Sequence, residues 1–280
     1  MFMLDEIVAH KRVELERKKR EASAARLRDK LAAARAPRDF RGALKAPGIS
    51  LIAEIKRKSP SKGEFRAKFE PEQLARAYEA GGASAISVLA DEAFFGNGAS
   101  VVEQVANLGG LSLPVMYKDF IVDEYQILEA RAVGADAALV IVRSVPDDRQ
   151  LAELLALAGE LGMGVIAECF TPADAERALG AGAKIVGINN RDLQTFEVDI
   201  RRAGQIRALL GGDIVTVSES GMHSRSDALQ AQSDGFDAML VGEAILSAAD
   251  PGEAVRRFVG REAEGGAAEE AAAGKEGVAG

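Results

Sequence analysis

The sequence has very few of the residues that build disulfides, metal centres and catalytic triads. It contains one cysteine, Cys169, and two histidines, His10 and His223, among 280 residues. A single cysteine excludes an internal disulfide and is typical of a reducing compartment, so we interpret Cys169 as a small core residue. Because the two histidines lie far apart in the sequence, a histidine-ligated metal site and a Ser-His-acid triad are both disfavoured.

Long hydrophobic runs and targeting signals are also missing from the sequence. No apolar run approaches the roughly 18 residues that a membrane-spanning helix needs. Residues 1–20 lack the apolar core of a signal peptide. The formal net charge of -8 makes attraction of the whole protein to nucleic acid or to an anionic membrane unexpected. These absences predict a cytoplasmic protein with no nucleic-acid partner and no membrane partner.

What the sequence does contain is a regular alternation of short apolar runs and amphipathic stretches. The predicted strands are 51–55, 85–89, 114–118, 137–141, 164–168, 184–189, 214–219 and 238–242. The predicted helices lie near 71–81, 99–109, 123–133, 147–161, 172–181, 199–210, 223–234 and 251–258. Strands that alternate with helices pair in parallel. With no Gly-rich dinucleotide motif and no P-loop, the pattern favours a closed (β/α)8 TIM barrel, an α/β fold, over an open sheet.

The joints between helices and strands carry their own signals. Thr171, followed by a proline, predicts a helix N-cap, and Asp123 with Gln126 resembles a capping box. Several predicted helices end at a glycine just before a strand, where the residue is expected to adopt the left-handed conformation that stops a helix. These glycines are Gly82, Gly134, Gly182 and Gly235.

Two segments flank the predicted barrel. Residues 1–48 are predicted to form a helical extension that caps it, residues 49–260 form the barrel, and residues 261–280 form a disordered, acidic, low-complexity tail. In the extension, the basic segment 11–20 predicts a solvated helix face. The opposite, apolar stripe is expected to comprise Leu4, Ile7, Val8 and Val13.

Charged and amide side chains end most of the predicted strands. Catalytic groups of barrels lie at the carboxyl ends of the strands, so we expect these side chains to share one rim. Taken singly, each could be a solvated residue or a cap. A charged group that directly ends an apolar strand is nevertheless costly unless it is paired or used, and several together favour an active site. The residues are Glu54, Lys56, Lys118, Glu168, Asn189 and Glu219.

The loops near this rim suggest an anionic substrate. The loop after the first strand is cationic and contains Ser59, while Arg57, Lys58 and Lys62 in it are interpreted as loop and surface charges. Loops after the last two strands of a barrel often bind phosphate through backbone N–H groups. Here they carry Ser220-Gly221 and Gly242-Glu243. Because no metal motif and no cofactor motif is present, we expect acid–base chemistry on a small phosphorylated molecule.

Seven segments resemble the indole-3-glycerol phosphate synthase family of tryptophan biosynthesis, in order and over about residues 4–258. They are AEIKRKSPSKG (53–63), ISVLAD with a following FF (86–95), KDFIVDEYQI (118–127), GADAALVI (134–141), GINNRDL (187–193), SESGM (218–222) and LVGEAIL (240–246). The N-terminal LDEIVAHKR and RDFRGAL segments are similar to the extra helices of that family, which cap the barrel and help to hold substrate.

The resemblance implies a reaction and roles for the residues already named. The reaction is ring closure, decarboxylation and dehydration of 1-(2-carboxyphenylamino)-1-deoxyribulose 5-phosphate by a cofactor-independent, metal-free carboxy-lyase. Lys118 is implied as the general acid, Lys56 as the partner of the substrate carboxylate and an aid to dehydration, and Glu168 as the second acid–base group. Positioning is implied for Glu54, Asn189 and Glu219. Substrate binding is implied for Ser59, Arg191, Ser220, Gly221, Gly242 and Glu243.

The chain departs from the family pattern at three places, one of which is Cys169, which follows Glu168 where valine or isoleucine is common. Tyr117 stands where arginine is usual before Lys118, which puts fine substrate positioning in doubt, and FFGNGAS (94–100) carries an extra residue that leaves the alignment of Ser100 open. Two alternatives are weighed: a phosphoribosylanthranilate isomerase, which would use a cysteine and an aspartate at strand ends, and a barrel that binds a phosphorylated ligand without catalysis. We expect a monomer or a weak homodimer.

Overall fold

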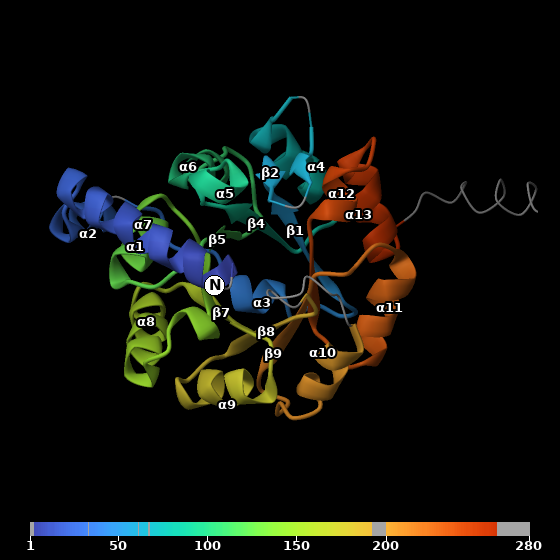
Figure 1. The fold of residues 1–280 in the computed structure, drawn as a ribbon. Helices are drawn as coiled ribbons and strands as arrows, with labels where there is room; N and C mark the ends of the chain where they lie inside the picture. The colour runs from blue at the N-terminus through green and yellow to red at the C-terminus, as the bar shows by residue number, and fades with distance from the viewer. Residues whose placement is uncertain (1–2, 33, 61, 67, 192–199, 262–280) are drawn as a thin grey trace, which may run out of the picture.

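A computed structural model describes residues 3–32, 34–60, 62–66, 68–191 and 200–261. Its centre is a closed barrel of eight parallel strands in the order β1-β10-β9-β8-β7-β6-β5-β4 (Figure 1). The strands are β1 (Ser50–Ile55), β4 (Ala85–Leu89), β5 (Val115–Lys118), β6 (Ala137–Ile141), β7 (Gly164–Cys169), β8 (Ile185–Asn189), β9 (Val215–Glu219) and β10 (Ala238–Val241). The predicted (β/α)8 TIM barrel is confirmed, with strand bounds within one residue of those predicted.

Helices surround the barrel and connect its strands (Figure 1). The connecting helices are α4 (Pro71–Gly81), α6 (Ala99–Ala106), α7 (Glu124–Ala132), α8 (Asp148–Glu160), α9 (Pro172–Gly180), α10 (Ile200–Arg207), α11 (Arg225–Ser233) and the closing α13 (Pro251–Val259). Short elements absent from the sequence prediction lie in the loops at the barrel mouth. They are the hairpin β2 (Lys58–Ser59) and β3 (Gly63–Glu64), the helices α5 (Glu92–Phe95) and α12 (Glu243–Leu246), and the 3-10 turn η1 (Val142–Ser144).

The predicted helix signals have mixed outcomes. Thr171 caps α9 in a full capping box with Asp174, as expected for its sequence. All four predicted stop glycines have positive φ angles. Asp123 is the N-cap of α7 and accepts from Tyr125 N, but the capping box with Gln126 does not form, because the Gln126 side chain accepts a hydrogen bond from the backbone N–H of Val122 and donates to Asp119 instead. Gln126 is therefore occupied by the loop that precedes α7.

The N-terminal extension consists of α1 (Met3–Glu21), α2 (Ala24–Leu31) and the short α3 (Phe40–Ala43). The helical pattern of residues 1–35 is interrupted before α2, where Ser23 forms a new N-cap by accepting from Arg26 N. In Figure 1, α1 runs from the outer ring of helices toward the barrel axis. Leu15 of α1 and Leu27 of α2 pack with Val122, Tyr125 and Leu128 around α7.

Two predictions for α1 are wrong. Val13, placed in the apolar stripe, has 72% of its surface exposed, whereas Lys11, placed on the solvated face, is only 1% exposed. The basic segment is therefore not a purely solvated face, because Lys11 turns inward to buried carboxylates. Of the tail predicted for 261–280, only Arg261 belongs to the described residues.

Two apolar layers account for most of the core. One fills the barrel with side chains such as Ile52, Met116 and Ile166, and the other lies between the strands and the helices, with Leu51, Ala53 and Ile55 from β1. A helix able to cross a bilayer is not found in the described part of the chain.

Candidate active site

The alternation of side chains along each strand determines which residues reach the interior of the barrel. Ile52 belongs to the interior layer, so Glu54, two residues later on β1, points the same way and lies at the carboxyl end. The same spacing places Lys118 two residues after Met116 on β5. Tyr117 lies between them in sequence and belongs to the outer layer.

Strands on the opposite side of the barrel follow the same rule. Glu168 lies two residues after Ile166 on β7, and Glu219 two residues after Val217 on β9. On β8, Asn189 lies four residues after Ile185, with Gly187 between them. The five strand-end groups therefore face one space because each has the same alternation phase as the apolar interior below it.

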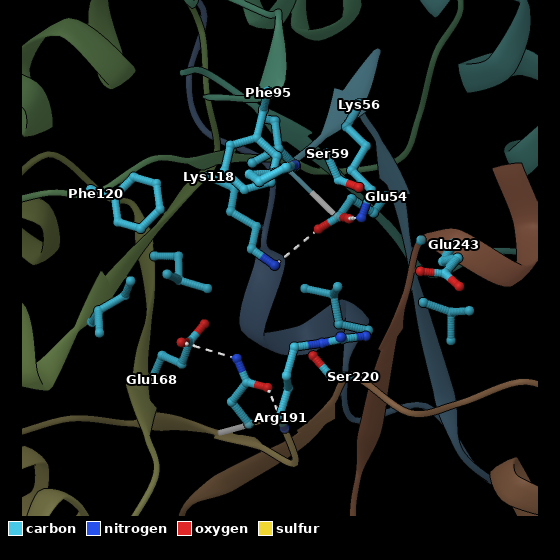
Figure 2. A pocket seen from close by; sticks show the side chains of 18 of the residues that line it. Glu54, Lys56, Ser59, Phe95, Lys118, Phe120, Glu168, Arg191, Ser220 and Glu243 are labelled. Carbon is cyan, nitrogen blue, oxygen red and sulfur yellow. Dashed lines mark hydrogen bonds and ion pairs between the residues drawn. The ribbon is translucent and has the colours of Figure 1, made fainter. Parts of the chain in front are cut away.

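That space is a cavity of about 500 Å³ at the carboxyl ends of the strands. Every site residue singled out in the sequence lines it except Glu219, which is 1% exposed. In Figure 2, Glu54 and Lys118 face Glu168 and Arg191 across the cavity, with Ser220 and Glu243 toward one side. The lining members of the predicted set are Glu54, Lys56, Ser59, Lys118, Glu168, Asn189, Arg191, Ser220, Gly221, Gly242 and Glu243.

Glu54 links the two lysines of the cavity. Its Oε1 lies 2.6 Å from Lys56 Nζ and its Oε2 lies 2.9 Å from Lys118 Nζ (Figure 2). Burial alone would raise the pKa of Glu54, but Lys118 and Lys56 outweigh burial and lower that pKa to about 2. Burial would lower the pKa of Lys118, but Glu54, Glu219 and Glu168 raise it above its usual value. At neutral pH the cavity thus contains an ammonium group held by carboxylates.

Glu168 and Glu219 form a pair of carboxyl groups beside Lys118. Burial, followed by the charge of Glu168, raises the pKa of Glu219 well above its usual value. The pKa of Glu168 is raised by burial against the lowering effect of Lys118, Asn189 and Glu219. Asn189 Nδ2 donates to Glu168 Oε1 at 3.2 Å, and Glu219 Oε2 lies 3.8 Å from Lys118 Nζ. Because two like charges so close together are costly, the pair favours protonation of one carboxyl group, and the pKa of Glu219 is the more strongly raised of the two.

Two glycines make room for these carboxylates. A side chain at Gly242 would collide with Glu54 Oε1, and a side chain at Gly187 would collide with Glu219 Oε1. Gly242 has a φ of -121°, so its small size matters here, not its backbone freedom. From the sequence, Gly242 was expected only to bind phosphate, and no role was expected for Gly187.

The loops after β9 and β10 form the side of the cavity away from Lys118. Ser220 has a φ of 67° and Gly221 has a φ of 79°, and Ser220 is the one non-glycine residue with positive φ in the described chain. The buried Asn190 supports this conformation by donating to Ser220 O at 2.9 Å and to Ser218 Oγ at 3.1 Å. A strained backbone held by its surroundings is common at ligand sites.

The cationic loop after β1 reaches the same side of the cavity. Lys62 is exposed, as the sequence predicts, but its ammonium also pairs with Glu243 at 2.5 Å. Lys58 donates to Ala93 O at 3.2 Å, and the Arg57 guanidinium lies over the Phe69 ring. These three charges therefore hold the loop in place around Ser59, which lines the cavity.

Comparisons with known proteins identify the family of the chain. The family model described as "Indole-3-glycerol phosphate synthase" matches residues 4–258. The chain belongs to the indole-3-glycerol phosphate synthase family. A relative of that name from Roseiflexus castenholzii is 44% identical over 266 residues, covering 92% of this chain and 98% of the relative. Another from Micrococcus luteus is 45% identical over 263 residues, covering 92% and 97%.

Solved structures that resemble the chain support the fold alone. Thiamine phosphate pyrophosphorylase from Pyrococcus furiosus superposes with a TM-score of 0.57 at 18% identity, over 75% of this chain and 93% of that one. A mandelate oxidase variant superposes with a TM-score of 0.53 at 20% identity, over 76% and 70%. Such identities are too low to carry function, since one barrel fold serves many activities.

The apolar part of the cavity was not predicted from the sequence. It matters for an indole-3-glycerol phosphate synthase family member because it forms one wall of the cavity. Phe95 and Phe120 lie on the β4 and β5 side with ring centroids 6.2 Å apart. Leu4 and Ile7 of α1 also line the cavity. The signal for the two aromatic residues was their place in the loops that follow strand ends, six residues after β4 for Phe95 and two residues after β5 for Phe120, where only polar groups were expected to matter.

The departures from the indole-3-glycerol phosphate synthase pattern lie outside the cavity. The fully buried Tyr117 donates its hydroxyl to Glu129 Oε2 at 2.8 Å and does not line the cavity, so the expected effect on substrate positioning is not supported. Ser100 is exposed on α6 and is not a lining residue. Cys169 is fully buried in the outer layer, as predicted, which leaves the isomerase alternative without its cysteine in this cavity.

Proposed function

We propose that the chain converts 1-(2-carboxyphenylamino)-1-deoxyribulose 5-phosphate into indole-3-glycerol phosphate, carbon dioxide and water. It acts as a cofactor-independent carboxy-lyase of tryptophan biosynthesis through general acid–base catalysis. One observation carries the proposal. Lys118 Nζ lies 2.9 Å from Glu54 and 3.8 Å from Glu219, at a cavity that combines an aromatic wall (Phe95 and Phe120) with backbone turns suited to phosphate. Membership of the indole-3-glycerol phosphate synthase family supports the same reaction.

In this proposal the substrate lies across the cavity. Its phosphate binds at the loops after β9 and β10, to Ser220 and Gly221 and to the backbone N–H groups of Gly242 and Glu243. Its carboxylate pairs with Lys56, next to Ser59 and Arg191. Its aromatic ring packs against Phe95 and Phe120. This orientation matches cationic and N–H groups to the two anionic ends and apolar groups to the ring between them.

Ring closure is the first chemical step. The aryl carbon that carries the carboxylate attacks the ketone carbon, and the ketone oxygen receives a proton from the Lys118 ammonium as the carbon–carbon bond forms. A developing alkoxide is a stronger base than an amine, so the transfer is favourable although carboxylates raise the pKa of Lys118. The cationic intermediate then loses carbon dioxide, because the electron pair of the breaking bond restores the aromatic ring. No external electron sink is needed.

Dehydration follows at the same carbon. The bond from the ring carbon to the hydroxyl oxygen breaks as that oxygen receives a proton, and a base removes a proton from the neighbouring ring carbon. Glu168, which shares a proton with Glu219, and Lys56 are the acid–base groups for this step. Glu54 and Asn189 hold Lys56, Lys118 and Glu168 through the hydrogen bonds described above.

The proposal includes no metal and no organic cofactor, and the small phosphorylated substrate is the only partner. The described residues contain no group of three or more His, Cys, Asp or Glu side chains arranged to hold a metal ion. The cytoplasmic location and the monomeric or weakly dimeric state remain predictions. A ligand-binding barrel without catalysis is the less favoured alternative, because binding alone gives no reason for a buried carboxyl pair beside Lys118.

Replacing Lys118 tests the proposal. Lys118→Met removes the proton donor but keeps an unbranched side chain, so turnover should fall at least about a thousandfold while binding of the product stays within about tenfold. Turnover is measured by indole fluorescence with the synthetic substrate, and product binding by calorimetry. The control is Lys45→Met, which removes a lysine that is exposed and remote from the cavity. Turnover by Lys118→Met at the wild-type rate would refute the role of Lys118, and absence of turnover by the wild type would refute the function.

A further inference from the structure

A buried ammonium group connects α1 to the two strands that carry the aromatic wall. Lys11 Nζ lies 2.8 Å from Asp91 Oδ2 and 2.9 Å from Asp119 Oδ1, and all three residues are almost fully buried. Asp91 follows β4 and Asp119 follows β5. Lys11 does not itself line the cavity, so any effect on substrate acts through other residues.

Each aspartate also holds the backbone of a phenylalanine. Asp91 Oδ1 accepts from Phe94 N at 2.7 Å, and Asp119 Oδ1 accepts from Phe120 N at 2.8 Å. Phe120 lines the cavity, and Phe94 directly precedes Phe95, which lines it as well. One ammonium group is thus the shared partner of two carboxylates that fix the loops bearing both rings. The His10 ring, next to Lys11 on α1, packs edge-on against the Phe94 ring.

We propose that Lys11 is a positioning residue that sets the separation of Phe95 and Phe120 and thereby the fit of the aromatic ring of the substrate. This inference rests on the proposed function, which supplies a substrate with such a ring. Asp119 directly follows Lys118, so the same ammonium also fixes the end of the strand that delivers the proton donor. The N-terminal extension therefore contributes to the site through a buried charge as well as through the apolar side chains that cover it.

Electrostatics explains why a cation is required at this point. Burial raises the pKa of Asp119, and Lys11 opposes this effect. Without the ammonium, Asp91 and Asp119 would be two buried carboxyl groups that must separate or share a proton. Either change weakens the charge-assisted hydrogen bonds to the backbone of Phe94 and Phe120, since a neutral carboxyl group is the poorer acceptor.

Lys18 offers a matched comparison on the same helix. Its ammonium pairs with Glu129 of α7 at 2.9 Å and with Glu14 at 3.2 Å. Neither carboxylate lines the cavity. Glu14 also accepts from Lys11 at 2.9 Å, so the two ammonium groups share this carboxylate, but Lys18 forms no ion pair with Asp91 or Asp119 in the described structure. Loss of Lys18 removes a partly buried ion pair of α1 in the same way but should leave the cavity unchanged.

The test compares Lys11→Met with Lys18→Met in the full chain, at a temperature where both are folded. We expect KM of Lys11→Met to rise and kcat/KM to fall about tenfold or more, because small misplacements of binding groups are costly. Lys18→Met should keep both constants within about twofold. A purely structural role of Lys11 would reduce the amount of active enzyme and leave KM unchanged. Equal kinetics of the two variants would overturn the proposal.

Two further measurements keep the proposal testable if Lys11→Met does not fold or the substrate is not turned over. The charge-balanced variant Lys11→Met/Asp91→Asn relieves the repulsion and keeps an acceptor for Phe94 N, so it should fold as stably as Lys18→Met and still show the raised KM. Amide hydrogen exchange without ligand should be faster at 92–97 and 120–122 in this variant and unchanged in Lys18→Met. Unchanged exchange at both loops overturns the positioning role, whereas an inactive wild type overturns only the proposed function.

Discussion

Glu54 and Gly242 fit closely against each other beside the cavity. Glu54 is ionised between two lysines and therefore needs a defined position, and the space for its carboxylate exists because Gly242 lacks a side chain. The glycine that follows β10 thus serves the carboxylate of β1 in addition to any contact with phosphate. Gly242 can in this way determine where the Lys118 ammonium is held, because Glu54 pairs with it.

Gly242→Ala should displace Glu54 and disturb both of its ion pairs. We expect kcat to fall roughly ten- to a hundredfold, since misplaced catalytic groups cost about this much. Stability should fall by about 1–3 kcal/mol from overpacking. Both are measured by indole fluorescence and by urea unfolding. The control is Gly159→Ala in α8, where a new Cβ meets nothing within 4 Å and should leave kcat unchanged. Wild-type kcat for Gly242→Ala would show that Glu54 has room to move.

Residue types at strand ends could be inferred from the sequence, while their partners could not. Glu54, Lys118 and Glu168 were identifiable because a charged residue ended an apolar run and the barrel pattern directed all of them to one rim. The burial of Lys11 could not be inferred, because its carboxylates come from β4 and β5, far along the chain. From helix periodicity alone such a lysine is assigned to the solvated face, because the carboxylates that neutralise it are not known.

At the scale of elements, the N-terminal extension is attached at both ends of the barrel. Lys11 of α1 binds at the mouth, and the segment before α3 binds at the opposite end through Arg35 and Arg38. Their guanidinium groups lie 2.6 Å and 3.1 Å from the carboxylate of Asp136, which is fully buried in the loop before β6. Asp136 also accepts from Val115 N of the neighbouring β5 at 2.8 Å.

A second aspartate, Asp237, holds the equivalent place before another strand and has no arginine partner among the described residues, so the two aspartates can be compared. Asp237 precedes β10 and accepts from Thr216 N of the neighbouring β9 at 2.8 Å. Asp136→Asn keeps an acceptor for the strand but leaves Arg35 and Arg38 without their carboxylate. We expect it to lower the free energy of unfolding by roughly 2–4 kcal/mol, and Asp237→Asn by about 1 kcal/mol. Urea unfolding of both variants measures the difference, and equal losses would mean that the arginines add no stability.

The regular elements were largely readable from the sequence, and the irregular ones were not. Strand positions followed from apolar runs, and helix ends followed from glycines such as Gly134, whose φ is 94°. The hairpin β2–β3 and the helices α5 and α12 are two to four residues long, which is too short for a periodic signal. Their form depends on contacts across the barrel mouth, such as that of Lys58 with Ala93 O.

For the molecule as a whole, buried carboxyl groups of two kinds should shape stability against pH. Glu54 has its pKa lowered to about 2, so its contribution is complete above its usual pKa of 4.5 and is lost as the pH falls from there to about 2. This loss amounts to about 3 kcal/mol. Glu219 and Glu168 have raised pKa values, so the folded chain binds protons more tightly there and stability declines as the pH rises above 4.5.

The two effects together predict a maximum of stability on the acid side of neutrality. Urea midpoints measured from pH 3 to pH 9 should rise to this maximum and then decline. Glu219→Gln, which carries no titrating group, should remove much of the decline on the neutral side and leave the acid loss. Glu72→Gln, at an exposed helix position, serves as the control. A wild-type profile that keeps rising through neutral pH would contradict the shared proton of the carboxyl pair.

The barrel closes where β1, its first strand in the chain, pairs with β10, its last. Strand β1 hydrogen-bonds to β10, from Ser50 opposite Ala238 to Ala53 opposite Val241, and Gly242 follows directly. The lysines, Phe95, Phe120 and the carboxyl pair all precede β10 in the chain and are therefore synthesised before it. Glu54 acquires its final surroundings only when the last strand of the barrel has left the ribosome and closed the ring. We therefore expect nascent chains to be inactive until closure, so that the onset of turnover would report that single event.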